Sequence, residues 1–140
     1  MFSKLQFSLT GFEGQFDSRC PMCANDDNMR NVIHAKFDAC GIKVTGKDYM
    51  YAAHYVPAES EFVQTLLRTY ENYTGLKGEC LAIGGGTYSR MMPNTVAFGV
   101  VFPEEEDCCH IADEYICIES MMKATRNYAH AIAELASHNI

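Results

Sequence analysis

The chain has 140 residues, of which 48% are apolar and 21% are charged, the balance of an ordinary globular protein. Lys and Arg number 11 and Asp and Glu number 18, so the net charge is −7, which argues against a protein that binds nucleic-acid phosphates. No apolar run approaches the roughly 20 residues of a membrane span, and no signal peptide is recognisable. We therefore expect a cytoplasmic protein with no membrane partner.

The seven cysteines are an odd number and are scattered along the chain. Small secreted proteins that depend on disulfides usually carry an even number and fewer apolar core residues. The composition therefore favours free thiols in a reducing compartment for Cys20, Cys23, Cys40, Cys80, Cys108, Cys109 and Cys117.

The first third of the chain predicts a short sheet followed by a helix. Apolar and polar residues alternate over residues 5–16, which predicts one or two strands with a bend at Gly11 or Gly14. Helix-capping residues then precede apolar residues at helical spacing, and this pattern predicts a helix within residues 25–40 that ends at Gly41.

The remaining elements alternate between predicted strands and helices. Residues 42–55 are rich in Val, Thr and Tyr and predict a strand or hairpin, and the segment 57–75 predicts a helix with an apolar face. Short buried strands are expected at 80–83 and 96–102, and a last helix at about 119–136. The order β–α–β–α–β–β–α indicates an α/β or α+β arrangement.

A glycine-rich turn follows the third predicted strand. Gly84, Gly85 and Gly86 precede Thr87, without the Lys and Ser/Thr that complete a nucleotide-binding P-loop. Such a turn often has only a structural role. Its functional interpretation is a cradle of backbone N–H groups for a carboxylate or an oxyanion, assisted by Thr87 and Arg90.

Three other features have alternative interpretations. His110 follows an acidic loop and is either a surface residue or a metal ligand. Arg19 is either a surface cation or a bidentate clamp for a substrate carboxylate. The CxxC motif formed by Cys20 and Cys23, together with Cys108 and Cys109, is either a set of free thiols or part of a zinc or redox site.

Taken together, several motifs resemble the carboxyl-terminal portion of PepV-type zinc dipeptidases. This metallopeptidase group includes carnosinases, aminoacylases, carboxypeptidase G and succinyl-diaminopimelate desuccinylase. The resemblance covers essentially the whole chain and rests on residues 16–21, 55–57, 73–75, 82–90, 93–94, 96–99, 102–103, 110–116 and 122–132.

The resemblance implies a fold and a set of site residues. Residues 1–56 would form the second half of an α+β lid of the kind that mediates dimer contacts, and residues 57–140 the last part of an aminopeptidase-like α/β catalytic domain. In the family two zinc ions share a bridging water, and a Glu acts as general base. His110 would be the last zinc ligand, and Arg19 would bind the substrate's carboxylate. Gly85, Gly86 and Thr87 would lie on the substrate side.

The family's other zinc ligands and its catalytic Glu precede the lid, and this chain contains none of that region. We therefore expect a carboxyl-terminal portion of an enzyme for dipeptides or N-acyl amino acids that is inactive alone. It would need the missing amino-terminal half or a second copy of itself, and we expect a homo-oligomer. The alternatives are a non-catalytic binding or oligomerisation module and a cysteine/histidine zinc or redox protein.

Overall fold

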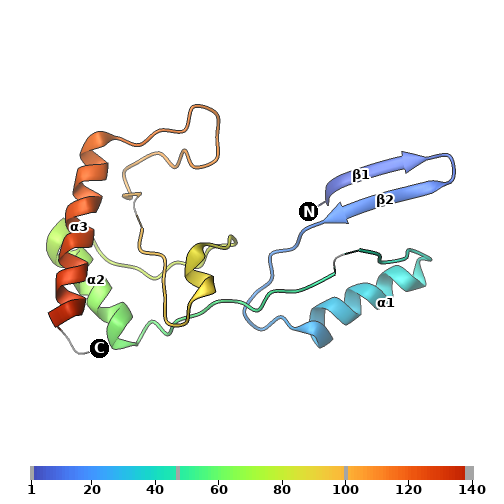
Figure 1. Cartoon of the computed structure of the whole chain (residues 1–140), viewed down its shortest axis with the longest axis horizontal. Coiled ribbons are helices and arrows are strands. Elements are labelled where there is room, and N and C mark those ends of the chain that lie inside the picture. Colours follow the sequence, from blue (N-terminus) through green and yellow to red (C-terminus); the bar gives the residue numbers. More distant parts are fainter. Residues whose placement is uncertain (1, 47, 100, 138–140) are drawn as a thin grey trace. The chain divides into compact units, whose positions relative to one another are not determined.

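The computed structural model of the chain describes residues 2–46, 48–99 and 101–137 (Figure 1). It divides into two compact units, Met1–Tyr55 and Val56–Ile140, and each is considered by itself. Helices occur together with a small antiparallel sheet, which confirms the expected mixed α/β class. None of the helices in the described residues is long and apolar enough to cross a membrane.

The first unit begins with a hairpin of strands β1 (Phe2–Ser8) and β2 (Gly11–Phe16), as the alternating pattern predicted. The bend lies at residues 9–10, immediately before Gly11. The Ser8 hydroxyl closes it, because it accepts a hydrogen bond from the Thr10 backbone N–H at 3.3 Å and donates one to the Gly11 carbonyl at 3.1 Å. The side chains of β2 are exposed along its whole length, so the hairpin buries little apolar surface.

The helical part of this unit starts with a reciprocal cap. The Asn25 side chain accepts hydrogen bonds from the backbone of residues 27 and 28, and the Asn28 side chain accepts one from the Asn25 N–H at 2.8 Å. A π-helical turn, η1 (Asp26–Arg30), leads into α1 (Asn31–Ala39). The chain leaves α1 through Gly41, whose φ of 71° is the left-handed conformation that favours glycine.

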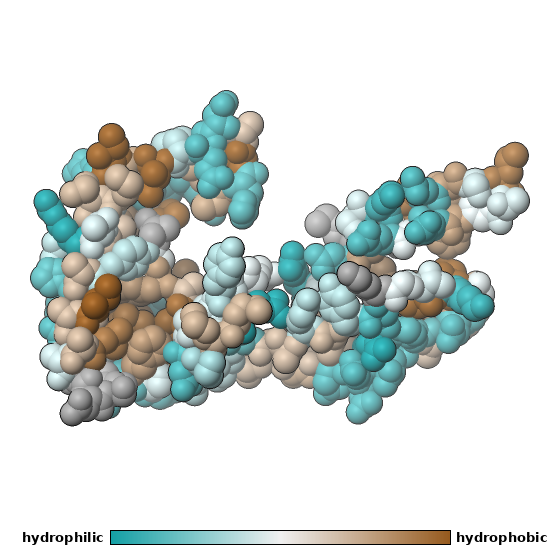
Figure 2. Space-filling model, in the orientation of Figure 1, coloured by the Kyte–Doolittle hydropathy of each residue, from teal (hydrophilic) through white to brown (hydrophobic). Residues whose placement is uncertain are grey.

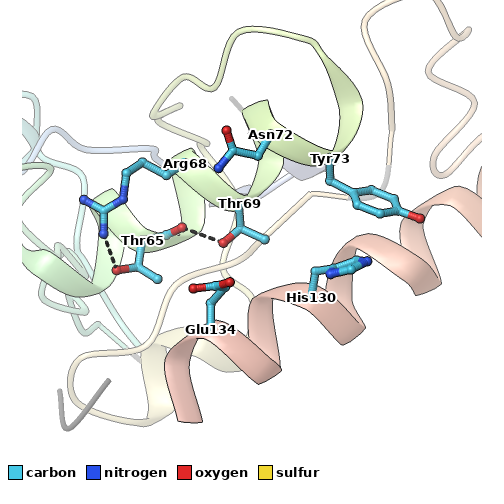
Figure 3. Close-up of a pocket in the computed structure, with 7 residues that line it drawn as sticks. All are labelled: Thr65, Arg68, Thr69, Asn72, Tyr73, His130 and Glu134. Carbon is cyan, nitrogen blue, oxygen red and sulfur yellow. Dashed lines mark hydrogen bonds between the residues drawn. The ribbon is translucent and has the colours of Figure 1, made fainter. Parts of the chain in front are cut away.

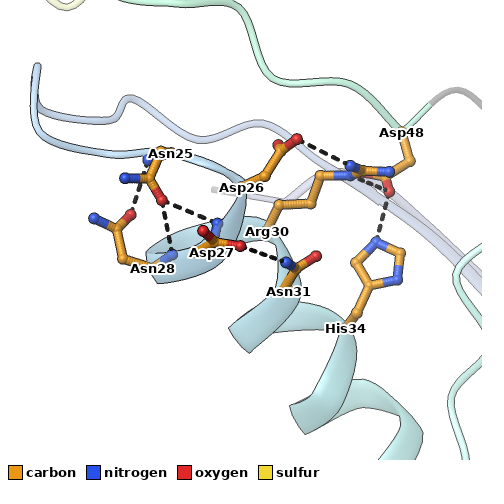
Figure 4. A network of polar contacts seen from close by, with 8 residues as sticks. All are labelled: Asn25, Asp26, Asp27, Asn28, Arg30, Asn31, His34 and Asp48. Carbon is orange, nitrogen blue, oxygen red and sulfur yellow. Dashed lines mark hydrogen bonds and ion pairs between the residues drawn. The ribbon is translucent and has the colours of Figure 1, made fainter.

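An ion-pair cluster fastens the segment after α1 back onto the helix (Figure 4). The Asp48 carboxylate lies 2.9 Å from Arg30 Nε and 2.6 Å from His34 Nε2. Arg30 also pairs with Asp26 at 3.4 Å. The hydrogen bond from Arg30 is the main reason that the pKa of Asp48 lies below its usual range. This cluster therefore holds a segment whose described residues form no helix or strand.

The second unit is built on two long helices that pack against each other, α2 (Glu61–Thr74) and α3 (Ile118–Ser137) (Figure 1). Ser60 caps α2, since its hydroxyl accepts a hydrogen bond from the Val63 N–H, and Gly75 ends the helix with a φ of 72°. The first and last residues of α2 and α3 agree with the sequence prediction to within a few residues. Among the described residues of this unit, the buried ones are Val63, Thr65, Leu66, Thr69, Phe102, Cys108, Ser120, Ala124, Asn127 and Ala131.

The buried positions of α3 carry small and polar side chains, and several of its large apolar residues lie at the surface. Ser120, Ala124, Asn127 and Ala131 are the buried positions of α3. Ile118 and Ile132, by contrast, are 74% and 68% exposed. Hydrophobic side chains are visible at the surface of this unit in Figure 2. Contiguous exposed apolar patches of this kind often mark interaction sites.

Three predicted strands are wrong. The described residues of 42–55, 80–83 and 96–102 form no strand, while Lys47 and Val100 lie outside the described residues. The expected burial of 80–83 is also wrong, because Leu81 is 83% exposed. The physical reason is that a strand forms only where its N–H and C=O groups pair with a neighbour. The described part of the chain supplies no neighbour strand for these segments.

Candidate functional site

The glycine turn, Thr87 and Arg90 come together at one place. Thr87 begins the short helix η2 (Tyr88–Met91), because its hydroxyl accepts a hydrogen bond from the Ser89 N–H at 3.3 Å. The Arg90 N–H donates to the Thr87 carbonyl at 3.3 Å. A Cβ atom on Gly86 would lie 2.9 Å from Arg90 Nη1, so the guanidinium lies across the turn where a side chain would otherwise be.

This arrangement is chemically suited to an anion. A bare glycine backbone permits close approach, and a half-buried guanidinium beside it supplies positive charge. Gly85 is more open, since a Cβ atom there would meet nothing within 4 Å. The absence of Cβ is therefore sterically relevant at Gly86, where the arginine side chain lies close, and not at Gly85.

His110 lies in the loop formed by residues 103–117. It has a left-handed backbone conformation, with a φ of 66°, which is uncommon for residues other than glycine. Its backbone N–H donates a hydrogen bond to the Glu114 carboxylate at 3.2 Å, which helps to hold this conformation. The residue is exposed, so its imidazole is accessible from outside the unit. Strained backbone of this kind concentrates at functional sites.

The base of the same loop is fixed to the helices. Phe102 is buried, stacks on Tyr70 of α2 with ring centroids 6.4 Å apart, and lies under the Lys123 ammonium of α3 at 4.1 Å. Glu105 accepts hydrogen bonds from the Phe102 N–H at 3.0 Å and from the Ser120 hydroxyl. The acidic loop is thus partly structural, because Glu105 joins its base to α3.

Cys108 joins the two sides of this loop. Its thiol is buried and donates a hydrogen bond to the Tyr115 carbonyl at 3.1 Å. The sequence did not predict this structural role of Cys108. The one signal that it offered was the position of Cys108 two residues before His110, a candidate metal ligand. The neighbouring Cys109 is exposed, and the Asp107 carboxylate raises the pKa of its thiol by hydrogen bonding and by its charge. The negative charge of Asp107 therefore disfavours the thiolate form of Cys109.

Arg19 belongs to the other unit, and it follows β2. Its guanidinium Nη2 lies 3.3 Å from the Asp17 carboxylate, and both side chains are more than half exposed. Cys20 and Cys23 belong to the same unit as Arg19, whereas Cys108 and Cys109 belong to the second unit. All seven cysteines are free thiols. The structure thus brings Gly86, Thr87 and Arg90 together within the second unit. His110 is exposed in the same unit, and Arg19 is exposed in the first unit.

Comparison with known protein families shows the family to which the chain belongs. The profile of peptidase family M20/M25/M40 matches residues 10–134. The chain belongs to this family. No solved structure matches the chain. The M20/M25/M40 profile covers residues of both structural units, including all the candidate site residues named above.

Several relatives in the M20/M25/M40 comparison are named as dipeptidases. The protein named "Putative dipeptidase YtjP" of Bacillus subtilis is 46% identical over 105 residues, which are 75% of this chain and 23% of that protein. The "Beta-Ala-Xaa dipeptidase" of Lactobacillus delbrueckii subsp. lactis is 36% identical over 117 residues, which are 84% of this chain and 24% of that protein. The chain therefore spans about a quarter of the length of these relatives.

The residues of this M20 chain do not fit a complete zinc site. A catalytic zinc takes about three protein ligands. Among the described residues, no group of three or more His, Cys, Asp or Glu side chains is placed to hold a metal ion. His110 would supply one imidazole to such a site, so no catalytic step through a metal is derived for this chain.

Proposed function

We propose that this chain is the carboxyl-terminal part of a metal-dependent enzyme that hydrolyses dipeptides or N-acyl amino acids. The match of the peptidase family M20/M25/M40 to residues 10–134 carries the proposal. The relatives named as dipeptidases support the substrate class. Because the chain spans about a quarter of their length, the activity belongs to a larger assembly of which this chain is one part.

In this proposal the chain binds the end of the substrate that carries the carboxylate. Arg19 binds the carboxylate through its planar guanidinium, which matches the two oxygens in a bidentate manner. Its present partner is the exposed carboxylate of Asp17, and an exposed ion pair of this kind is exchanged at little cost. The turn of Gly85, Gly86 and Thr87, with Arg90, contacts the substrate through backbone N–H groups and positive charge.

His110 is the metal ligand that this chain contributes. The exposed position of His110, on a loop that Glu105 joins to Ser120 of α3 and that Cys108 closes onto Tyr115, supports this assignment. The other ligands and the general base come from an amino-terminal half or from a second copy of the chain. Residues 1–56 act as the second half of a lid and residues 57–140 as the end of the catalytic domain. The chain alone is inactive, and the complete protein is cytoplasmic.

A chimera tests the proposal directly. The corresponding segment of the Lactobacillus Beta-Ala-Xaa dipeptidase would be replaced by residues of this chain, since the two align over 117 residues. Hydrolysis of β-alanyl dipeptides by the chimera is expected, and His110→Ala should reduce kcat by more than about 100-fold, because even partners of a metal ligand contribute 10–100-fold. His54→Ala, an exposed histidine of the first unit, is the matched control. A folded chimera in which both variants hydrolyse equally fast would overturn the role of His110.

Zinc titration of the 140-residue chain provides an independent test. Calorimetry should detect no tight stoichiometric site in the wild type or in His110→Ala, because one imidazole is an incomplete ligand set. Hydrolysis of simple dipeptides with added Zn²⁺ or Mn²⁺ should likewise be absent. Tight binding or turnover that disappears in His110→Ala would show that the chain completes a site by itself or across a dimer.

A second candidate function is a non-catalytic binding or oligomerisation module. The exposed hairpin favours it, since Phe7 and Phe12 are 76% and 52% exposed and form an aromatic pair with centroids 6.2 Å apart. Exposed strand edges and apolar side chains often recruit another chain. Light scattering of the purified chain is expected to give a dimer or larger species. A monodisperse monomer would contradict this candidate.

A further inference from the structure

A cavity of about 330 Å³ lies between α2 and α3, on residues that have no part in the function proposed above (Figure 3). It is formed entirely within the second unit, by side chains of these two helices. Its size is within the range of pockets that hold small molecules. Its lining is mostly polar and carries both signs of charge, so the occupant should be polar and charged as well.

The positive group is Arg68 of α2. Its Nη2 donates a hydrogen bond to the Thr65 hydroxyl at 3.0 Å, which orients the guanidinium along the helix. No carboxylate pairs with Arg68 within the described part of the chain. A guanidinium has five N–H donors, and most of those of Arg68 are therefore available to a ligand.

The negative group is Glu134 of α3. In Figure 3 its carboxylate points from α3 toward Thr69 of the facing helix. The Thr69 hydroxyl itself is occupied, because it donates to the Thr65 carbonyl at 2.8 Å. A purely anionic ligand would be repelled by Glu134, and a purely cationic one by Arg68. A ligand that carries both charges is attracted by both.

An aromatic wall forms the other end of the cavity. The rings of Tyr73 and His130 lie 4.4 Å apart between centroids, with an angle of 36° between their planes. Both side chains line the cavity, one from each helix. Aromatic surfaces of this kind favour a planar apolar group of a ligand.

We propose that this cavity binds a free α-amino acid with an aromatic side chain. Its carboxylate pairs with Arg68, its ammonium group pairs with Glu134, and its ring packs against Tyr73 and His130. The proposal is independent of the dipeptidase assignment, since it uses neither His110 nor Arg19. Free amino acids are also the class of product that dipeptide hydrolysis releases, so such a site would respond to accumulated product.

Titration of the 140-residue chain with L-phenylalanine, followed by ligand-observed NMR or calorimetry, tests the proposal. N-acetyl-L-phenylalanine lacks the ammonium charge, and L-phenylalaninamide lacks the carboxylate. Each should bind at least about tenfold more weakly than L-phenylalanine, the loss expected for one charged contact. Equal binding of the acetylated compound, or no binding of L-phenylalanine at about 10 mM, would overturn the proposal.

Variants separate this site from the one of the proposed function. Arg68→Gln and Glu134→Gln should each weaken L-phenylalanine binding at least about tenfold, because each removes one charge without removing bulk. Glu119→Gln and Arg126→Gln, which change another exposed carboxylate and an exposed guanidinium of α3, should bind like the wild type. Circular dichroism confirms that each variant is folded. Loss of binding in Arg19→Gln, with normal binding in Arg68→Gln, would place the amino acid at the substrate site and overturn the inference.

Discussion

The Cys108 thiol donates a hydrogen bond to the Tyr115 carbonyl at 3.1 Å, and this contact joins the two sides of the loop that carries His110. The thiol is buried, whereas His110 two residues further along is exposed. A loop that is fixed by such contacts and carries an exposed imidazole suits the metal-ligand role proposed for His110, because a preorganised side chain loses less entropy on binding.

Replacement of Cys108 by alanine should destabilise the second unit. The change removes a buried hydrogen bond and some packing, and the free energy of unfolding should fall by about 1 kcal/mol. Urea denaturation followed by circular dichroism measures this change. Cys117→Ala, at an exposed cysteine, should change the free energy by less than about 0.5 kcal/mol. Equal effects of the two substitutions would show that the Cys108 contact is not stabilising.

Replacement of Asp107 by asparagine should make Cys109 more reactive. Asp107 raises the pKa of this thiol, because a nearby negative charge disfavours the thiolate. Its removal lowers the pKa, and more thiolate is present at a given pH. The rate of Cys109 alkylation by iodoacetamide near pH 8 should therefore rise severalfold, as measured by peptide mass spectrometry. Glu104→Gln removes a nearby exposed charge and should leave the rate unchanged.

The Asp48 cluster should stabilise the first unit in a pH-dependent way. The pKa of Asp48 is lowered in the folded chain, so its stabilising effect is present above the unfolded pKa and is lost as the pH falls through the folded value. Asp48→Asn should therefore accelerate hydrogen exchange of residues 42–55 at neutral pH, and the difference from wild type should shrink below about pH 4. Asp38→Asn, an exposed aspartate of α1, is the control. Equal exchange in both variants would contradict the role of the cluster.

Replacement of Gly75 by alanine should destabilise α2 at its end. Gly75 has a φ of 72°, and its N–H donates to the Glu71 carbonyl at 2.9 Å. A side chain in the left-handed conformation costs about 1 kcal/mol. Thermal unfolding should detect a lower midpoint in Gly75→Ala. Gly85→Ala should melt like the wild type, since Gly85 has no positive φ and open space around it.

The helices were predictable because their signals are local. The Asn25 and Ser60 caps, and the glycines at positions 41 and 75, lie within the segments that they delimit. The strands predicted at 80–83 and 96–102 depend on partners elsewhere. The described part of the chain holds no such partners, so the described residues of these segments form no strand, and Leu81 is largely exposed.

The candidate site was predictable to a similar degree. The proximity of Gly86, Thr87 and Arg90 follows from their closeness in the sequence, and the structure places them together. The role of Glu105 was not predictable, because it depends on Ser120 from a distant helix. The roles proposed for His110 and Arg19 rest on family resemblance, since neither residue has a local pattern that distinguishes it from a surface residue.

The position of Arg90 across Gly86 has an evolutionary consequence. An alanine at position 86 would bring a methyl group within 2.9 Å of the guanidinium, and the flexible arginine side chain would move away while the backbone stayed in place. The substitution would therefore preserve the fold and change only the direction of one positive charge. The two positions should covary among homologues: a glycine should be retained where the arginine is retained, and both should be replaced in descendants that no longer need the charge.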